Sequence, residues 1–264
     1  MTLRMETRGP VRIVALDRPE RRNAVDPETA TALHRAFLDF EDSEASVAVL
    51  TGRGGAFCAG FDLTRAGDVG ADWAERLAVR SADDLQDGAP GPMGPTRLRL
   101  SKPVIAAVEG PAVAGGLELA LWCDLRVAAE DAFFGVYCRR WGVPLIDGGA
   151  IRLPRVVGQG RALDMILTGR RVEAAEALSW GLADRLAPPG GALAAALALA
   201  EEISRFPQGC LRADRGVALD QWALPRGAAF AREWESLAAF EAEGVRGAAR
   251  FAGGKGRGGD FGDI

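Results

Sequence analysis

A short apolar run that leads through a glycine-rich turn into a helix constrains the fold of this chain more than any other feature. Residues 103–108, PVIAAV, are apolar and partly β-branched, which predicts a buried strand. Residues 110–124, GPAVAGGLELALWCD, then place Gly115 and Gly116 at a helix start and Glu118 on its first turn. Glycine lets a ligand approach the backbone, and the first amides of a helix can hold an anion. Backbone amides and the carboxyl group of Glu118, a candidate proton carrier, are therefore expected to face one point.

Strand-helix-strand order recurs along the first half of the chain. Val11, Ile13 and Ala15 occupy alternate positions, which predicts a strand with one covered face. The expected helix 27–42, with Asp26 as its cap, and the strand 46–51 follow. The same order returns in strand 103–108, helix 115–123 and strand 125–129, so an α/β fold is predicted. Later segments with a helical pattern are 159–167, 173–180, 191–205 and 226–244.

Composition limits the class of partner. With 264 residues, 48% of them hydrophobic, and a mean hydropathy of +0.02, the chain can bury a full α/β core. The 32 Lys and Arg against 36 Asp and Glu give a net charge of −4, without the basic excess of a nucleic-acid-binding protein. Residues 1–10 have no apolar run of signal-peptide length, and no run long enough to span a membrane occurs elsewhere. Nucleic acid and membrane are thus not expected as partners, and the expected location is cytoplasmic.

Cysteine and histidine usage argues against several site chemistries. The four cysteines, at positions 58, 123, 138 and 210, are widely spaced and are interpreted as reduced core thiols, with no metal site. His34 is the only histidine, so a Ser-His-Asp triad would need His34 itself as the base. His34 lies beside the apolar stripe of helix 27–42, where a structural or solvated role is expected.

A second glycine-rich loop gives the first motif a partner. The strand at 47–51 runs into residues 52–63, GRGGAFCAGFDL. Together with residues 101–128, this loop resembles the two signature regions of the crotonase superfamily, or enoyl-CoA hydratase/isomerase family, and the resemblance continues through residues 131–135 and 158–182. It implies the crotonase (ClpP-like) fold of stacked β-β-α turns. It also implies a core at 1–195 for acyl-CoA binding and catalysis, and a helical region at 196–264 that forms a homotrimer or a dimer of trimers.

The resemblance also implies a site for an acyl-CoA thioester. The peptide N–H groups of Phe61 and Gly115 match the oxyanion hole of the family, and Glu118 matches one of two catalytic glutamates. Contacts to coenzyme A are implied at further positions, namely Arg22, Ala24, Ala59, Phe61, Asp62 and Leu63. Coenzyme A would enter as part of the substrate, and neither a metal nor a redox cofactor is implied.

The chain departs from the family at the second glutamate. That position falls on Cys138, and a neutral thiol is a poor substitute for a carboxylate. Asp147 lies close to the place where isomerase branches carry their acid, so Glu118 and Asp147 are candidates for an acid-base pair. The alternative for Asp147 is a helix cap.

These observations favour an acyl-CoA-processing enzyme. The leading hypothesis is an enoyl-CoA hydratase that adds water in the syn sense to 2-enoyl-CoA, in fatty-acid or related acyl-CoA metabolism. An isomerase that uses Glu118, Asp147 or both is the alternative, and a crotonase homologue that binds acyl-CoA without turnover is a third hypothesis.

Two further regions carry expectations. The Gly- and Pro-rich residues 86–95 either border the acyl pocket or form a tolerated surface insertion. Trp73, Leu77, Met93 and Trp141 are candidate pocket walls. Phe230, Trp234, Leu237 and Phe240 recur near helical spacing, which predicts a subunit interface, with core packing inside the chain as the alternative.

Overall fold

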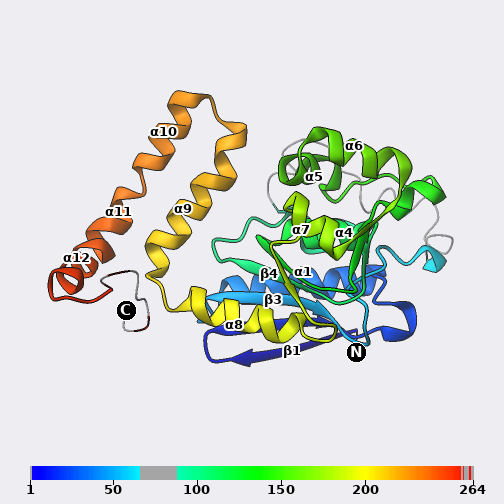
Figure 1. Cartoon of the computed structure of the whole chain (residues 1–264), viewed down its shortest axis with the longest axis horizontal. Helices are drawn as coiled ribbons and strands as arrows, with labels where there is room; N and C mark the ends of the chain where they lie inside the picture. Colours follow the sequence, from blue (N-terminus) through cyan, green and yellow to red (C-terminus); the bar gives the residue numbers. More distant parts are fainter. Residues whose placement is uncertain (1, 66–87, 257, 259–261, 263–264) are drawn as a thin grey trace. The chain divides into compact units, whose positions relative to one another are not determined.

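The computed structural model describes residues 2–65, 88–256, 258 and 262, and Figure 1 shows the course of the chain. The chain divides into two compact units, residues 1–200 and residues 201–264. The first unit holds both sheets and the predicted site. In the described part of the chain, no helix combines the length and the apolar character needed to cross a membrane.

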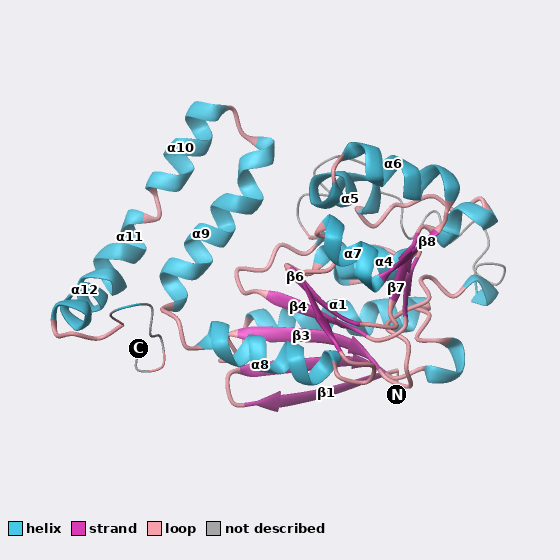
Figure 2. Ribbon diagram, viewed as in Figure 1, coloured by secondary structure: helices cyan, strands magenta, loops and turns pink. Residues whose placement is uncertain are grey.

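The first unit is built on a six-stranded sheet (Figure 2). Its strands lie in the order β1 (Leu3–Arg8), β2 (Val11–Leu16), β3 (Val47–Gly52), β4 (Val104–Val108), β6 (Leu125–Ala129) and β9 (Arg185–Ala187). β1 is antiparallel to β2, and the remaining neighbours pair in parallel. Every residue of β3 and β4 is buried, which is why these strands are mostly apolar. β2 is buried on both faces except at the half-buried Arg12, so the prediction of one covered face for this strand is wrong.

A smaller sheet leads into the predicted helix start. It contains β5 (Pro111–Val113), β7 (Phe133–Gly135) and β8 (Arg171–Glu173), with β5 parallel and β8 antiparallel to β7. β5 follows β4 across the single turn at 109–110 and is followed directly by α4 (Gly115–Trp122). The path from buried strand to helix therefore contains a short extra strand that the sequence pattern did not predict.

Helices pack against both sheets. α1 (Pro27–Glu41) begins as predicted, because the Asp26 side chain accepts a hydrogen bond from the Thr29 N–H at 2.8 Å. It buries Leu33, Phe37 and Phe40 against the core. Among the described residues, the α-helices that follow α4 in this part of the chain are α5 (Gly149–Val157), α6 (Gln159–Thr168), α7 (Ala174–Trp180) and α8 (Ala192–Ser204). Three of them match predicted segments, whereas α5 was not predicted.

The second unit is a helical hairpin in which α9 (Gln208–Asp220) lies beside the chain that returns through α10 (Arg226–Trp234), α11 (Leu237–Ala239) and α12 (Val245–Ala252). The carboxylate of Glu243 accepts hydrogen bonds from the N–H groups of Gly209 and Cys210, at 3.0 and 2.9 Å. This contact satisfies first-turn amides of α9 and joins the two arms.

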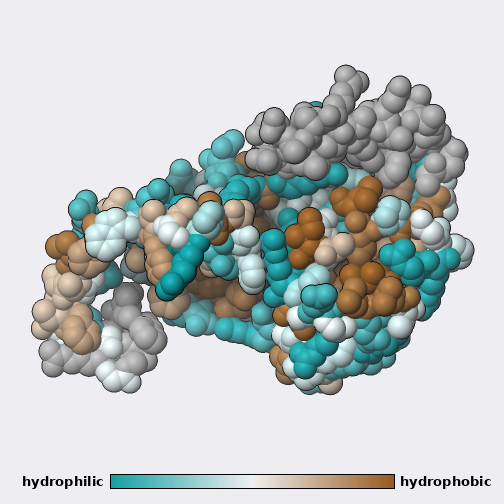
Figure 3. Space-filling view, turned by 90° about the horizontal axis from the view of Figure 1, so that it is seen from above, coloured by the Kyte–Doolittle hydropathy of each residue, from teal (hydrophilic) through white to brown (hydrophobic). Residues whose placement is uncertain are grey.

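The predicted helix 226–244 is wrong in its continuity. α10 ends at Trp234, and a π-helical turn at Phe240–Gly244 leads into α12. Four apolar side chains of this region, Phe230, Trp234, Leu237 and Phe240, are exposed. Figure 3 shows hydrophobic surface beside hydrophilic surface on this unit. Packing within the described part of the second unit therefore does not bury these residues, and the subunit interface stays a prediction.

All four cysteines are free thiols, as predicted. Cys58, Cys123 and Cys138 are buried as predicted, whereas Cys210 is exposed, so the prediction of a core position is wrong for Cys210. Burial raises the pKa of the Cys58 thiol to about 12, so that thiol is neutral at physiological pH.

Candidate active site

Glycine residues bring the two sequence motifs into contact. Gly60 has φ +97°, and a Cβ at this position would lie 2.9 Å from the Ala114 side chain and 3.0 Å from the Gly115 nitrogen. A Cβ on Gly116 would lie 2.1 Å from the Cys58 carbonyl oxygen. Side chains at either position would separate the loop after β3 from the start of α4. The predicted convergence of the two loops therefore depends on residues without side chains.

Backbone hydrogen bonds direct the Phe61 amide. Phe61 forms a parallel bridge with Val25, in which the Val25 N–H donates to the Gly60 carbonyl at 2.8 Å and the Asp62 N–H donates to the Val25 carbonyl at 2.9 Å. In such a bridge the central residue directs its own N–H to the opposite side. Gly115 is the first residue of α4, so its N–H has no acceptor within the helix. Both residues line one cavity.

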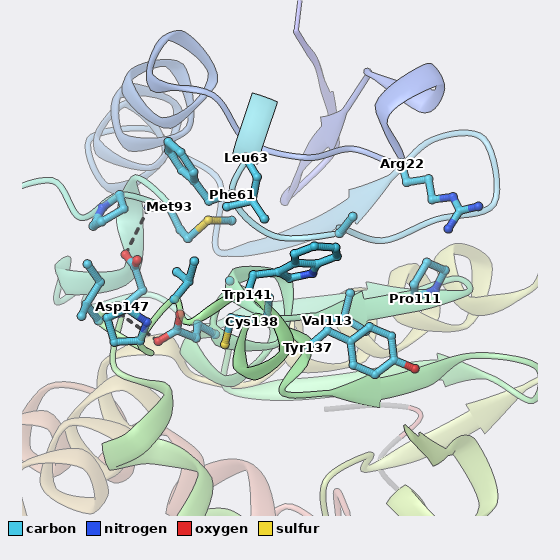
Figure 4. Close-up of a pocket in the computed structure, with 18 of the residues that line it drawn as sticks. Arg22, Phe61, Leu63, Met93, Pro111, Val113, Tyr137, Cys138, Trp141 and Asp147 are labelled. Atoms are coloured by element: carbon cyan, nitrogen blue, oxygen red, sulfur yellow. Dashed lines mark hydrogen bonds between the residues drawn. The ribbon is translucent and has the colours of Figure 1, made fainter. Parts of the chain in front are cut away.

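This cavity has a volume of about 250 Å³ and a largely apolar wall (Figure 4). Arg22 and Pro111 lie at one end of it, and Met93 and Asp147 at the other. The remaining lining residues are Ala59, Phe61, Leu63, Pro92, Val113, Ala114, Gly115, Glu118, Phe133, Tyr137, Cys138, Trp141, Val143, Pro144 and Ile146.

Glu118 is the buried carboxyl group of this cavity. Its side chain is on the first turn of α4 and the residue is 3% exposed. Oε1 accepts hydrogen bonds from the N–H of Asp147 at 2.9 Å and from the N–H of Gly149 at 2.8 Å. Gly149 is the first residue of α5, so Glu118 also satisfies an open helix amide.

The environment of Glu118 makes it a weak acid. Burial raises its pKa to about 7, with a smaller contribution from the charge of Asp147, while the two amides and Arg152 act in the opposite direction. A carboxyl group with this pKa can both accept and donate a proton near neutral pH.

The structure brings Asp147 to the same cavity as Glu118. Asp147 is 3% exposed, and its Oδ1 accepts hydrogen bonds from the Met93 N–H at 3.1 Å and the Thr96 hydroxyl at 2.5 Å. Burial is the largest influence on its pKa, which is raised. The N-cap of α5 is Gly148, so the alternative interpretation of Asp147 as the cap of that helix is wrong.

Cys138 lines the cavity from a 3₁₀ turn, Tyr137–Trp141. Burial, and then the nearby charge of Glu118, raise the pKa of its thiol. The thiol is therefore protonated at neutral pH, and it supplies no second carboxylate.

The predicted contacts to coenzyme A fall into two groups. Arg22, Ala59, Phe61 and Leu63 line the cavity, whereas Ala24 and Asp62 are not among its lining residues. The Ala24 carbonyl accepts a hydrogen bond from the Arg18 guanidinium. The Asp62 carboxylate pairs with Arg18 at 3.1 Å and accepts a hydrogen bond from the Thr64 hydroxyl at 2.6 Å. Asp62 therefore stabilises the conformation of the loop after β3.

Asn23 has a structural role that the sequence analysis missed. It is fully buried with φ +57°, its amide donates to the carbonyls of Arg53 and Ala56 at 2.9 and 2.6 Å, and its carbonyl accepts from the Arg18 N–H. Asn23 thereby fixes Arg22 against the loop after β3. Asparagine is favoured in left-handed backbone, so its place beside the turn at 18–21 was the available signal.

Of the Gly- and Pro-rich segment, residues from Gly88 onward are described, and Pro92 and Met93 line the cavity. These two residues therefore border a cavity, as predicted, and the assignment of that cavity to the acyl group stays a prediction. Met93 and Trp141 are pocket walls as predicted, while Trp73 and Leu77 lie outside the described residues.

A family model described as enoyl-CoA hydratase/isomerase matches residues 6–217 of the chain. The chain belongs to the enoyl-CoA hydratase/isomerase family. Members of this family act on acyl-CoA thioesters, and the chain is an enzyme of this class. The predicted family resemblance is confirmed.

Two curated relatives illustrate the breadth of the enoyl-CoA hydratase/isomerase family around this chain. Enoyl-CoA hydratase EchA19 of Mycobacterium tuberculosis is 41% identical over 205 residues, which cover 76% of this chain and 73% of that protein. Carnitinyl-CoA dehydratase of Salmonella arizonae is 40% identical over 205 residues, which cover 76% of this chain and 74% of that protein.

Solved structures of the family confirm the predicted crotonase fold. A crystal structure of an enoyl-CoA hydratase from Mycobacterium tuberculosis matches with a TM-score of 0.84 and 35% identity over 95% of each chain. A structure of an enoyl-CoA hydratase subunit from Geobacillus kaustophilus matches with a TM-score of 0.84 and 30% identity, covering 96% of this chain and 95% of that one.

Proposed function

We propose that this enzyme adds water in the syn sense across the double bond of a 2-enoyl-CoA. The observation that carries the proposal is the position of Glu118. This carboxyl group, with a pKa of about 7, lines the same cavity as Gly115, the first residue of its own helix. The names of the two hydratase structures and of the relative EchA19 agree with this activity.

The thioester oxygen is the atom that needs stabilisation. When water adds to Cβ, the electrons of the double bond move toward Cα and the carbonyl, and negative charge collects on the thioester oxygen. The N–H groups of Phe61 and Gly115 are proposed to hold that oxygen. A donor of this kind contributes on the order of 3 kcal/mol in the transition state.

Glu118 is proposed to carry the proton in both halves of the reaction. As carboxylate, it accepts a proton from the water whose oxygen bonds to Cβ. As carboxylic acid, it returns a proton to Cα of the enolate, which restores the starting state. A pKa near the working pH favours both transfers. Both described hydrogen bonds fall on Oε1, which leaves Oε2 as the oxygen that exchanges the proton.

Asp147 is proposed as the second carboxyl group of the site. Its charge raises the pKa of Glu118, and its own pKa is raised by burial. In a hydratase this keeps Glu118 basic enough to deprotonate water. Arg22, Ala59 and Leu63, at the cavity wall, would contact the coenzyme A part of the substrate. No metal or redox cofactor is needed for these steps.

The replacement of the second glutamate by Cys138 favours one other candidate function, enoyl-CoA isomerisation. A single carboxyl group suffices to take a proton from Cα of a 3-enoyl-CoA and to return one to Cγ, because both carbons lie on one conjugated enolate. Glu118, Asp147 or both would carry this transfer. An acyl-CoA-binding protein without turnover is disfavoured, since it has no need for a buried carboxyl group beside the oxyanion donors.

The exposed apolar residues of the C-terminal unit support assembly into a homo-oligomer, as a trimer or a dimer of trimers. We place the enzyme in the cytoplasm.

Absorbance assays separate the candidate functions. Crotonyl-CoA loses its ultraviolet absorbance on hydration, whereas a 3-enoyl-CoA gains absorbance on isomerisation to the conjugated form. The proposal predicts loss of crotonyl-CoA absorbance and formation of 3-hydroxybutyryl-CoA. A gain from the 3-enoyl substrate alone would establish isomerisation instead, and no change with either substrate would exclude both reactions.

A further inference from the structure

Arg152, on the second turn of α5, joins two segments that are distant in the sequence. Its Nη1 donates a hydrogen bond to the Asp147 carbonyl at 2.9 Å, and its Nη2 donates to the Thr96 carbonyl at 2.6 Å. The planar guanidinium holds both carbonyls at once, which a single ammonium group does with less geometric control. Arg152 thereby fixes the spacing between the turn at 91–97 and the start of α5.

These two segments supply the donors of both carboxyl groups. The turn at 91–97 provides the Met93 N–H and the Thr96 hydroxyl to Asp147. The segment at 147–149 provides two amides to Glu118. A displacement between the segments would therefore disturb the hydrogen bonds of both acids.

The guanidinium also packs against the backbone between the two amides that serve Glu118. Gly148 has φ +92°, and a Cβ on it would lie 2.2 Å from Nη1 of Arg152. The approach is close enough that a side chain at position 148 would expel the guanidinium. Arg152 itself is not among the residues that line the cavity, so any effect on substrate passes through other residues.

From this geometry we propose that Arg152 is a positioning residue of the active site. Arg152 holds the start of α5 so that the N–H groups of Asp147 and Gly149 point at Glu118. Its guanidinium also places a positive charge near the carboxyl groups of Glu118 and Asp147, on the side away from the cavity. The inference rests on the proposed function of Glu118 as the proton carrier.

The charges around this group fix the direction of its influence. The charges of Asp147 and Arg152 act on Glu118, the charge of Glu118 acts on the Cys138 thiol, and Arg97 acts with Arg152 on Asp147. The buried Cys123 and the exposed Arg155 also lie within electrostatic reach of Arg152. Burial lowers the pKa of Arg152, but an arginine remains a cation at neutral pH. Since this cation favours ionised Glu118, its removal makes Glu118 a weaker acid.

The titration of Glu118 tests the inference without reference to turnover. Protein with ¹³C-labelled glutamate carboxyl groups is titrated by NMR, and the Glu118 signal is the one missing in Glu118→Gln. The wild-type midpoint is expected near 7. Arg152→Gln should raise it by about half a unit or more, because a nearby opposite charge is lost. Arg155→Gln, at an exposed position three residues later in α5, is the matched control and should leave the midpoint and kcat unchanged.

Kinetics test the positioning role. Arg152→Gln should lower kcat for crotonyl-CoA by on the order of tenfold, because small misplacements of catalytic groups are costly. KM should change less than about twofold, since Arg152 does not line the cavity. Arg152→Lys keeps the charge but not the double bridge, so the midpoint should stay near the wild-type value while kcat falls.

The outcomes are distinct. A wild-type midpoint and wild-type kcat in Arg152→Gln would overturn the inference. Should Arg152→Gln fail to fold, Arg152→Lys decides, and wild-type kcat in that folded variant would overturn it equally. If wild-type enzyme turns over no enoyl-CoA, the proposed function fails, while a raised midpoint in Arg152→Gln still upholds the placement of Arg152 behind Glu118.

Discussion

Oε1 of Glu118 lies 2.8 Å from the amide nitrogen of Gly149, the first residue of α5. The carboxyl group from the first turn of one helix thus receives an open amide from the start of another. The other described hydrogen bond of Glu118, from the Asp147 N–H, also ends on Oε1. Oε1 is therefore held in place, and Oε2 is left to exchange the proton.

Glu118→Gln isolates the proton-transfer role of this residue. The glutamine carbonyl oxygen can accept from both amides, so the local structure should persist. Turnover of crotonyl-CoA should fall by about 10²–10⁴-fold, the usual contribution of a general acid-base group. Calorimetric titration with butyryl-CoA should give an affinity within about twofold of wild type. Unchanged turnover would remove Glu118 from the mechanism.

The pH dependence of hydration follows from the pKa of Glu118. The free enzyme needs the ionised carboxylate to accept the proton of water, so kcat/KM should rise with pH and level off above a midpoint near 7. Initial rates across pH 5 to 9 in constant ionic strength measure this midpoint. A midpoint near 4.5, the ordinary value for glutamate, would show that burial does not control this group.

The free energy of unfolding should also depend on pH through Glu118, in a direction that the raised pKa of this residue determines. The pKa of Glu118 is raised in the folded state, to about 7 from 4.5, so the folded state binds more protons between these values than the unfolded state. The stabilisation is complete below pH 4.5 and is lost as pH rises toward 7. Urea unfolding should therefore show a free energy that falls by on the order of 3 kcal/mol across this window.

Asp147 contributes to the stability change in the same direction, because its pKa is also raised. In Glu118→Gln the decline should be smaller, since one of the two buried acids is gone. A decline as steep as that of wild type would mean that other groups cause it.

Gly60→Ala tests the approach of the two loops. The new Cβ would lie 3.0 Å from the Gly115 nitrogen, at a backbone φ of +97°. The strain should cost about 1–3 kcal/mol of stability, and the widened spacing of the amides should lower kcat. Gly55→Ala is the matched control, because Gly55 has φ +79° in the same loop with nothing within 4 Å of the added atom. Equal loss of kcat in both variants would assign the effect to backbone strain alone.

Asp147→Asn separates the two uses of Asp147. Its amide oxygen can still accept from Met93 and Thr96, but its negative charge is lost. If the enzyme is a hydratase, the variant should retain activity. The midpoint of its kcat/KM profile against pH should shift below 7, because the charge of Asp147 raises the pKa of Glu118. Loss of 3-enoyl-CoA isomerisation with retained hydration would identify Asp147 as the acid of the isomerase reaction.

Local signals predicted the parts of the site that depend on local structure. The apolar run at 104–108 and the glycine pair before Glu118 gave the buried strand and the helix start, and the loop at 57–63 gave its partner. The capped helix α1 was equally readable, because Asp26 and Pro27 are start signals close in sequence.

The relations that the sequence could not give are those between distant residues. The contact of Glu118 with the backbone at 147–149 spans about thirty residues, and no pattern in either segment encodes it. Arg152 was missed for the same reason, since its acceptors are carbonyl groups and every residue has one. The prediction of one continuous helix over 226–244 was wrong because the spacing of apolar residues is maintained across a short break, such as the one after Trp234.

Exchange of the Cα protons of butyryl-CoA in D₂O isolates enolate formation, because a saturated thioester can form the enolate but has no double bond to hydrate or move. We expect deuterium uptake at Cα with the wild-type enzyme, measured by mass spectrometry, and uptake reduced to the buffer rate with Glu118→Gln. Equal uptake by the two proteins, or none above buffer with the wild type, would show that Glu118 does not form the enolate in this cavity.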